Sequence, residues 1–171
     1  MPKLAKPTFQ KLVDNYRTET SSVHDCPRIY QKDELGNPNV NTCAVRFTEA
    51  LVIALGRIDS RTKIGNLTHG GGDGKGFLLG KYNYRDNLCP HGIARGARDV
   101  AYFLKEHWGS PTKTFLKPGE APAELIGMQG AISFIKIPGY GGQGHMDLWN
   151  KTACVGHGYF DADKVWFWRL D

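Results

Sequence analysis

Apolar residues recur at helical spacing in three segments of the first two thirds of the chain. These segments predict a short amphipathic helix over residues 9–16, a central helix that begins at Asn41 or Thr42 and stops at Gly56, and a longer helix over residues 93–108. The apolar positions are Phe9, Leu12, Val13 and Tyr16 in the first, Ala44, Phe47, Leu51 and Leu55 in the second, and Ile93, Ala97, Val100, Leu104 and Trp108 in the third. The N-terminal part of the chain is therefore expected to be helical.

The last third of the chain changes to short β-type runs separated by turn residues. The runs cover residues 131–137, 144–149, 153–160 and 165–170, and they predict an antiparallel β-meander. Helices first and strands last favour an α+β architecture in which the N-terminal helices pack on one face of the sheet. Trp166 and Trp168 in the last run are expected in the core rather than as a sugar-stacking platform. The length of 171 residues suits a single domain over residues 1–171.

Two polar segments between the predicted helices have the composition of loops. Residues 18–41 are broken by Cys26-Pro27 and Asn37-Pro38, and a residue before proline is disfavoured in a helix. Residues 65–76 are rich in glycine, but Lys75 is followed by Gly76 instead of the Ser or Thr of a phosphate-binding loop. We expect surface loops in both places.

Charge and hydropathy exclude several classes of function. The 22 Lys and Arg residues exceed the 17 Asp and Glu residues by five, but no basic run is present, so an acidic partner in general is favoured and nucleic acid is not. The longest apolar runs, such as residues 50–55, are too short for a membrane span. Thr8 to Lys11 stand where an export signal would need an apolar stretch, so no signal peptide is expected.

Four cysteines are spread along the chain without a paired motif, at Cys26, Cys43, Cys89 and Cys154. They are compatible with four thiols, with two disulfides, or with one reactive thiol and three bystanders. The histidines lack the H-x-x-x-H or H-x-H spacing of a zinc site, so neither a metal nor another cofactor is expected.

Cys43 and His145 stand in positions that suit a cysteine nucleophile and its base. Cys43 lies in the first turn of the central helix, where unpaired N–H groups and the helix dipole favour a thiolate. His145 occupies the first exposed position of a strand, and Asp147 shares its face because side chains alternate along a strand. A carboxylate beside an imidazole holds its tautomer, which predicts a Cys-His-Asp site. The plainer interpretation is a His and an Asp on a solvated strand face.

Four sequence blocks in this order resemble the fourth family of type VI secretion amidase effectors. The blocks are Asn41-Thr42-Cys43-Ala44-Val45-Arg46, Ala97 to Leu104, Gly144-His145-Met146-Asp147-Leu148-Trp149-Asn150 and Tyr159-Phe160. Cysteine before histidine, on a helix and then a sheet, is also the layout of papain-like peptidases of the NlpC type. The resemblance spans about three quarters of the chain.

The resemblance implies a papain-like fold and an antibacterial function. A member of this family is a toxin made in the cytoplasm, delivered by the type VI machinery without a signal peptide, and active in the periplasm of the target cell. It is a DL-endopeptidase that cleaves peptidoglycan between D-glutamate and meso-diaminopimelate, and it has a cognate immunity protein. The resemblance assigns the nucleophile to Cys43 and the base to His145.

Two positions depart from the family pattern. Family members carry a third catalytic Asp eleven residues after the histidine, where this chain has Gly156, and Asp147 is the replacement that we expect. His157 is the second candidate, and Asp161 or Asp163 the third. Gly158 replaces a paired cysteine of some relatives, so a disulfide through Cys154 would need Cys26 or Cys89. The Gly156 departure also supports the alternative function, a catalytically inactive module of the same fold that binds the cell wall or a partner.

Overall fold

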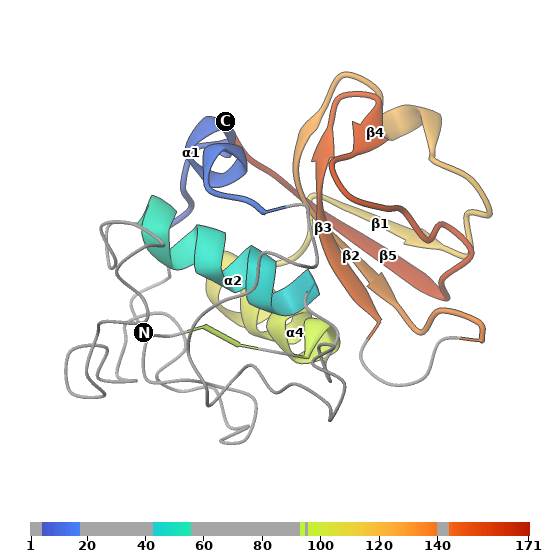
Figure 1. Cartoon of the computed structure of the whole chain (residues 1–171). Coiled ribbons are helices and arrows are strands. Elements are labelled where there is room, and N and C mark those ends of the chain that lie inside the picture. Colours follow the sequence, from blue (N-terminus) through green and yellow to red (C-terminus); the bar gives the residue numbers. More distant parts are fainter. Residues whose placement is uncertain (1–4, 18–42, 56–92, 95, 140–143) are drawn as a thin grey trace, which may run out of the picture. The chain divides into compact units, whose positions relative to one another are not determined.

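The computed structural model describes residues 5–17, 43–55, 93–94, 96–139 and 144–171 (Figure 1). The chain divides into two compact units, one of residues 10–95 and one of residues 1–9 with 96–171. The loops expected over residues 18–41 and 65–76 lie outside the described residues, as do Cys26 and Cys89.

The unit of residues 10–95 is built around the predicted central helix. α1 (Phe9–Asp14) and α2 (Cys43–Ala54) both form where the apolar periodicity predicts them. Thr48 in α2 donates to the carbonyl oxygen of Ala44 at 2.8 Å and accepts from the N–H of Ala94 at 2.9 Å. This buried hydroxyl therefore ties residues 93–94 to the middle of α2.

α4 (Ala97–Trp108) begins later than the sequence predicts. Gly96 has a φ of 97°, outside the helical region, and the helix starts at the residue after it. Ile93 and Ala94 are buried but not helical, because Ala94 bonds to Thr48 instead. The predicted start at residue 93 is therefore wrong, whereas the end at Trp108 before Gly109 is confirmed.

The second unit contains a five-stranded antiparallel sheet in the order β1-β5-β2-β3-β4. β2, β3 and β4 are consecutive neighbours, as in the expected meander, and β5 pairs between β1 and β2. The expected run over residues 153–160 forms a strand only at its first two residues, and β1 was not predicted. The strands are β1 (Lys113–Leu116), β2 (Gln129–Ile135), β3 (His145–Asn150), β4 (Ala153–Cys154) and β5 (Lys164–Arg169), and η3 (Ala123–Leu125) is a short 3-10 helix before β2.

Side chains pack on both faces of this sheet. α4 packs against β2 and β3 and covers one face, where the rings of Trp108 and Trp168 meet edge to face at 6.5 Å. The opposite face carries an apolar cluster of Leu125, Ile132, Phe134, Ile137, Trp149, Ala162, Val165 and Phe167. Trp166 and Trp168 are 5% and 0% exposed, so their predicted place in the core is confirmed. Together with the helices, the antiparallel sheet confirms the α+β class.

Candidate active site

His145 and Asp147 come to one face of the sheet through the alternation of β3. Antiparallel pairing places His145 opposite Phe134 and Asp147 opposite Ile132, on the face of the apolar cluster. Met146 between them is buried and points to the opposite side, because successive side chains of a strand alternate. The predicted shared face of His145 and Asp147 is therefore confirmed.

This face is not solvated, contrary to the expectation that His145 is exposed. His145 is 6% exposed and Asp147 is fully buried. The chain after β4 folds back over them: the N–H of Val155 bonds to the carbonyl oxygen of Leu148 at 2.8 Å, and the Phe160 ring lies 5.9 Å from the Trp149 ring. The interpretation as a surface pair is therefore wrong, because the covering segment turns this face into an interior.

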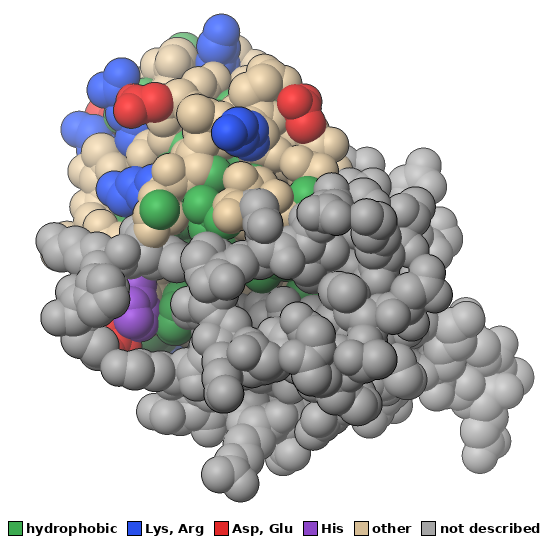
Figure 2. Space-filling model, turned by 90° about the vertical axis from the view of Figure 1, so that its left-hand side faces the viewer, with side chains coloured by type: hydrophobic (Ala, Val, Ile, Leu, Met, Phe, Trp, Pro, Cys, Tyr) green, Lys and Arg blue, Asp and Glu red, His purple; other side chains and the backbone are tan. Residues whose placement is uncertain are grey.

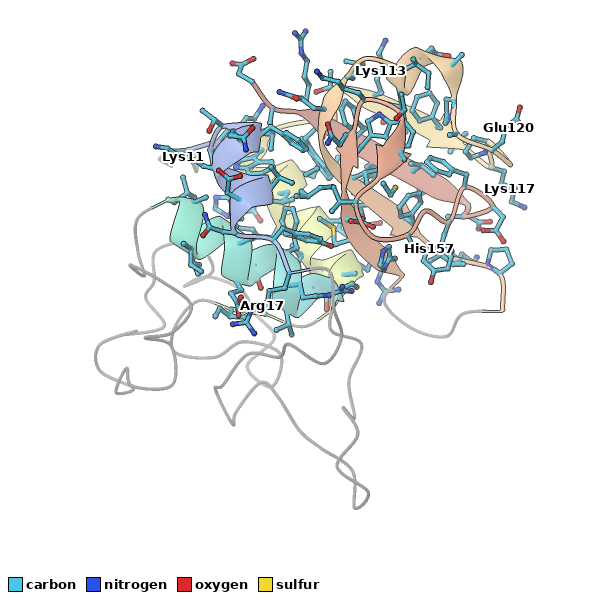
Figure 3. The ribbon with its side chains drawn as sticks, turned by 45° about the horizontal axis from the view of Figure 1, so that its top comes forward. Lys11, Arg17, Lys113, Lys117, Glu120 and His157 are labelled. Atoms are coloured by element: carbon cyan, nitrogen blue, oxygen red, sulfur yellow. The ribbon has the colours of Figure 1, made fainter. Side chains whose placement is uncertain are left out.

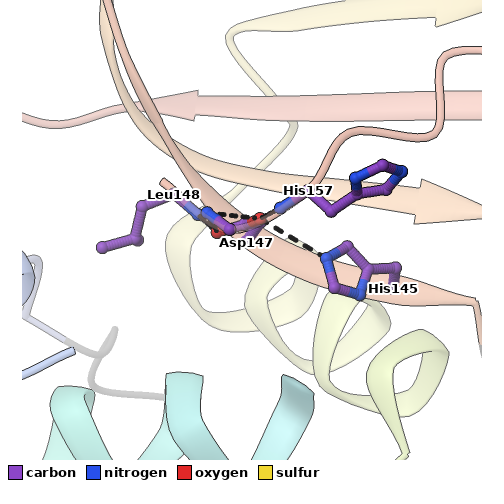
Figure 4. A network of polar contacts seen from close by, with 5 residues as sticks. His145, Asp147, Leu148 and His157 are labelled. Atoms are coloured by element: carbon purple, nitrogen blue, oxygen red, sulfur yellow. Dashed lines mark hydrogen bonds and ion pairs between the residues drawn. The ribbon is translucent and has the colours of Figure 1, made fainter. Parts of the chain in front are cut away.

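The imidazole of His145 contacts the carboxylate of Asp147. Nε2 of His145 lies 3.4 Å from Oδ2 of Asp147 (Figure 4). A carboxylate only accepts hydrogen bonds, so this contact favours the tautomer that carries its proton on Nε2. Nδ1 is then the ring nitrogen with basic character.

Backbone N–H groups hold the Asp147 carboxylate in place. Its Oδ1 accepts from the N–H of Leu148 at 2.7 Å, and its Oδ2 accepts from the N–H groups of Gly156 at 3.0 Å and His157 at 2.6 Å. Figure 4 shows the carboxylate between the His145 ring and the turn that follows β4. These three donors fix the position of the carboxylate beside the imidazole.

Gly156 leaves the space that the Asp147 carboxylate fills. A Cβ atom built on Gly156 would lie 2.7 Å from Oδ2 and 3.3 Å from Oδ1 of Asp147. Carbon atoms rarely approach an oxygen so closely, so a side chain at position 156 would displace the carboxylate. The position at which the family resemblance expects an aspartate therefore directly adjoins the carboxylate of Asp147.

The other candidates for the third catalytic group are engaged elsewhere. His157 offers its backbone N–H to Asp147, while its exposed imidazole points away from the carboxylate and packs against Tyr159 at 4.6 Å (Figure 4). Asp163 bridges Lys117 and Lys136, each at 3.6 Å, and Asp161 is exposed in the same turn. Asp147 is thus the candidate carboxylate that the structure brings to His145.

Cys43 is the first residue of α2 and is 1% exposed. This position agrees with the sequence prediction, and the N–H groups of a first helical turn have no partners within the helix. Cys43 belongs to the unit of residues 10–95 and His145 to the other unit.

The backbone donors to Asp147 and the aromatic rings beside His145 were not predicted from the sequence. The donors to Asp147 are main-chain groups of Gly156 and His157, which carry no sequence signal beyond the small size of Gly156. The rings of Phe134 and Tyr159 lie 6.0 Å and 5.0 Å from the His145 ring. The Tyr159-Phe160 block was the available signal for the second of these contacts.

Cys154 carries a free thiol that we expect to be unreactive. Burial raises the pKa of this thiol well above its ordinary value, and the negative charge of Asp147 raises it further. The thiol therefore stays protonated at neutral pH, and the thiolate is the form that reacts with alkylating agents. With iodoacetamide at pH 8, peptide mapping is expected to find Cys154 unmodified in the folded protein and modified in urea. Modification at equal rates in both would contradict the assignment.

Among the residues that the structure describes, no group of three His, Cys, Asp or Glu side chains could hold a metal ion. Lys, Arg, Asp and Glu are interspersed in Figure 2, and Lys117 and Glu120 both point outward in Figure 3. No helix in the described ranges has the length and hydropathy needed to cross a membrane.

Comparison with known proteins relates this chain to one family. A family model, described as type VI secretion system (T6SS) amidase effector protein 4 (Tae4), matches residues 39–168. Among curated proteins, none matches the chain.

Solved structures of similar fold carry the same family name. The Tae4-Tai4 effector-immunity complex from Salmonella Typhimurium aligns with a TM-score of 0.63 at 19% identity, over 98% of this chain and 100% of the other. The corresponding complex from Enterobacter cloacae gives 0.60 at 16% identity over 98% and 100%, and Tae4 alone from Enterobacter cloacae gives 0.60 at 17% identity over 100% of both chains. The expected papain-like fold of the NlpC type is confirmed.

Proposed function

Because the chain belongs to the type VI secretion amidase effector 4 family, we propose that it is a cysteine amidase that cleaves peptidoglycan between D-glutamate and meso-diaminopimelate. Membership of this family makes the chain an antibacterial effector and a hydrolase that acts on peptidoglycan. The proposal adds the bond, the class of enzyme and the residues. It also takes residues 1–171 as one papain-like domain.

The observation that carries the proposal is the buried contact between His145 and Asp147. A carboxylate that is completely buried, receives backbone N–H groups and adjoins an imidazole is arranged to orient that imidazole. Because any buried carboxylate needs such donors, the feature that points to catalysis is the contact of this carboxylate with the imidazole. The catalytic residues that we propose are Cys43 as nucleophile, His145 as base and acid, and Asp147 as the group that orients His145.

The reaction follows from the roles of these groups. Nδ1 of His145 takes the proton of the Cys43 thiol, and the sulfur attacks the carbonyl carbon of the amide between the two stem residues. The N–H of Cys43 donates to the oxyanion, since N–H groups at a helix start stabilise developing negative charge. His145 then protonates the leaving amine, and the C–N bond breaks to give a thioester.

Water completes the cycle. His145, again neutral, takes a proton from the water that attacks the thioester, and the C–S bond breaks to give a free carboxylate and the Cys43 thiolate, which regains its proton from His145. No cofactor takes part in the proposed steps. Asp147 keeps Nε2 of His145 protonated throughout and stabilises the imidazolium that forms twice in each turnover.

The alternative function, an inactive module that binds the cell wall, has less support. Its basis was the missing aspartate at Gly156, but the carboxylate of Asp147 fills the space next to Gly156. A relocated carboxylate therefore accounts for the departure at Gly156 without a loss of catalysis.

Family membership also suggests how the chain is delivered and which partner it has. We propose that the chain is injected by the type VI machinery, acts in the periplasm of the target cell, and is neutralised in the producing cell by a cognate immunity protein. Support for the last point comes from the similar structures, which are complexes of Tae4 with Tai4.

The test is digestion of purified sacculi that contain meso-diaminopimelate, with mass analysis of the products. The expected products are fragments that end in D-glutamate and fragments with a new amino group on diaminopimelate. The digestion is run under reducing and under oxidising conditions, because a thiol nucleophile is active only in its reduced form. Cleavage of another bond would contradict the proposed specificity, and no cleavage under either condition would favour the binding module.

A further inference from the structure

Tyr159 lies directly against the imidazole of His145. The two rings meet edge to face with centroids 5.0 Å apart and planes at 70°. The Phe134 ring lies 6.0 Å from the same imidazole and nearly parallel to it, at 28°. Phe134 and Tyr159 also touch each other at 6.1 Å and 74°. Two aromatic side chains that contact each other thus enclose the histidine.

The place of Tyr159 is fixed by the turn that also holds Asp147. Gly156 and His157 donate to the Asp147 carboxylate, and the chain reaches Tyr159 two residues later. A Cβ atom on Gly158 would lie 2.7 Å from the Phe160 ring, so a side chain at this position would displace that ring. The N–H of Ala162 then bonds to the carbonyl oxygen of Tyr159 at 3.0 Å. One segment therefore supplies both the donors to Asp147 and the ring against His145.

We propose that Tyr159 is a positioning residue, whose ring together with Phe134 holds the His145 imidazole so that Nε2 stays directed at Asp147. The proposal rests on the proposed function, because it assigns Tyr159 a role in that reaction. The distance of 3.4 Å from Nε2 to Oδ2 is long for a hydrogen bond. Packing against two aromatic rings also limits the rotation of the imidazole.

Tyr159 acts through His145, so removing its ring is expected to change the orientation of the imidazole first. Without the ring the imidazole gains rotational freedom, and water gains access to the contact with Asp147. A change confined to the histidine affects the chemical step rather than substrate binding, which predicts a loss in kcat at nearly constant KM. Since the ring is the active part, phenylalanine at this position is expected to preserve the function.

The first experiment measures the tautomer of the His145 imidazole and does not depend on enzyme activity. Long-range ¹H–¹⁵N NMR spectra of the full-length protein distinguish the two neutral tautomers, and a His145→Gln variant identifies the signal of His145. The expected result is the Nε2–H tautomer in the native protein and in Tyr159→Phe, and an average of both tautomers in Tyr159→Ala and Tyr159→Leu. Tyr102→Ala is the matched control, because Tyr102 packs against Trp166 on the other face of the sheet.

The second experiment measures cleavage of a soluble muropeptide by the same variants. Tyr159→Ala and Tyr159→Leu are expected to lower kcat roughly tenfold with KM within about threefold, while Tyr159→Phe and Tyr102→Ala stay near the native values. Tyr159→Leu keeps most of the buried volume, so it decides the question if Tyr159→Ala fails to fold.

Three results would overturn the proposal. One is an unchanged His145 tautomer in Tyr159→Leu, and another is an unchanged kcat in that variant. The third is a loss in Tyr159→Phe as large as in Tyr159→Leu, which would assign the role to the hydroxyl group. If the native protein does not cleave muropeptides at all, the proposed function fails, whereas the NMR comparison still tests the placement of His145 by Tyr159.

Discussion

Replacing Cys43 with alanine is expected to abolish the cleavage of sacculi. The proposed reaction has no other route to the thioester, so the rate is expected to fall by roughly 10⁴-fold or more. Alanine occupies slightly less volume than cysteine and favours helix, and Cys43 starts α2. The variant is therefore expected to fold normally, and the loss is chemical.

Two further variants test whether activity requires the thiol of Cys43 in particular. Cys43→Ser keeps the shape but offers a much less acidic nucleophile, and it is expected to retain only a trace of activity. Cys154→Ala removes a buried thiol that stays protonated, and its activity is expected to remain within about threefold of native. Cleavage rates are measured on sacculi by product release, with thermal unfolding as the control for folding. Substantial cleavage by Cys43→Ala would exclude Cys43 as the nucleophile.

The helices show what a local pattern can and cannot predict. The apolar repeat in α2 depends only on the residues of that helix, so Cys43–Ala54 forms as expected. The start of α4 was placed too early because Ile93 fits the same repeat. Whether residues 93–94 join the helix is decided by the bond between Ala94 and Thr48, which are 46 residues apart. A contact over such a distance leaves no local signal.

The sheet and the site show the same limit. The alternation of β3 was enough to place His145 and Asp147 on one face. It gave no indication that residues 155–160 cover this face, because the strand predicted over residues 153–160 ends after Cys154 and the chain then turns back. β1 was missed because a four-residue edge strand alternates too briefly to stand out from the loop that follows it. The shared face of His145 and Asp147 could therefore be predicted from sequence, but its burial and the backbone donors to Asp147 could not.

Replacing Asp147 with alanine is expected to lower kcat/KM by at least roughly 100-fold. The imidazole loses the carboxylate that holds Nε2, and the N–H groups of Gly156 and His157 lose their acceptor. His157→Ala is the matched control, because alanine keeps the backbone N–H that bonds to Asp147 and removes only the exposed ring. It is expected to stay within about threefold of native. If His157→Ala instead lost more activity than Asp147→Ala, His157 would be the third catalytic group.

The space next to Gly156 offers a second way to supply the carboxylate. Gly156→Asp in the native background is expected to inactivate the enzyme, because the new Cβ would lie 2.7 Å from Oδ2 of Asp147 and two carboxylates would compete for one place. In Asp147→Ala that place is empty. A carboxylate at position 156 then adjoins the former position of Oδ2, so the double variant Asp147→Ala with Gly156→Asp is expected to recover at least roughly tenfold over Asp147→Ala alone.

The double variant with Gly156→Ala measures what the added carbon does without a charge, and kcat/KM on a muropeptide compares the two. Recovery with aspartate but not with alanine would mean that His145 needs a carboxylate at this point in space, and that the chain position that supplies it is interchangeable. Equal activity of the two double variants would contradict this idea. The carboxylate of Asp147 would then act through its own hydrogen bonds to the turn rather than through its charge beside the imidazole.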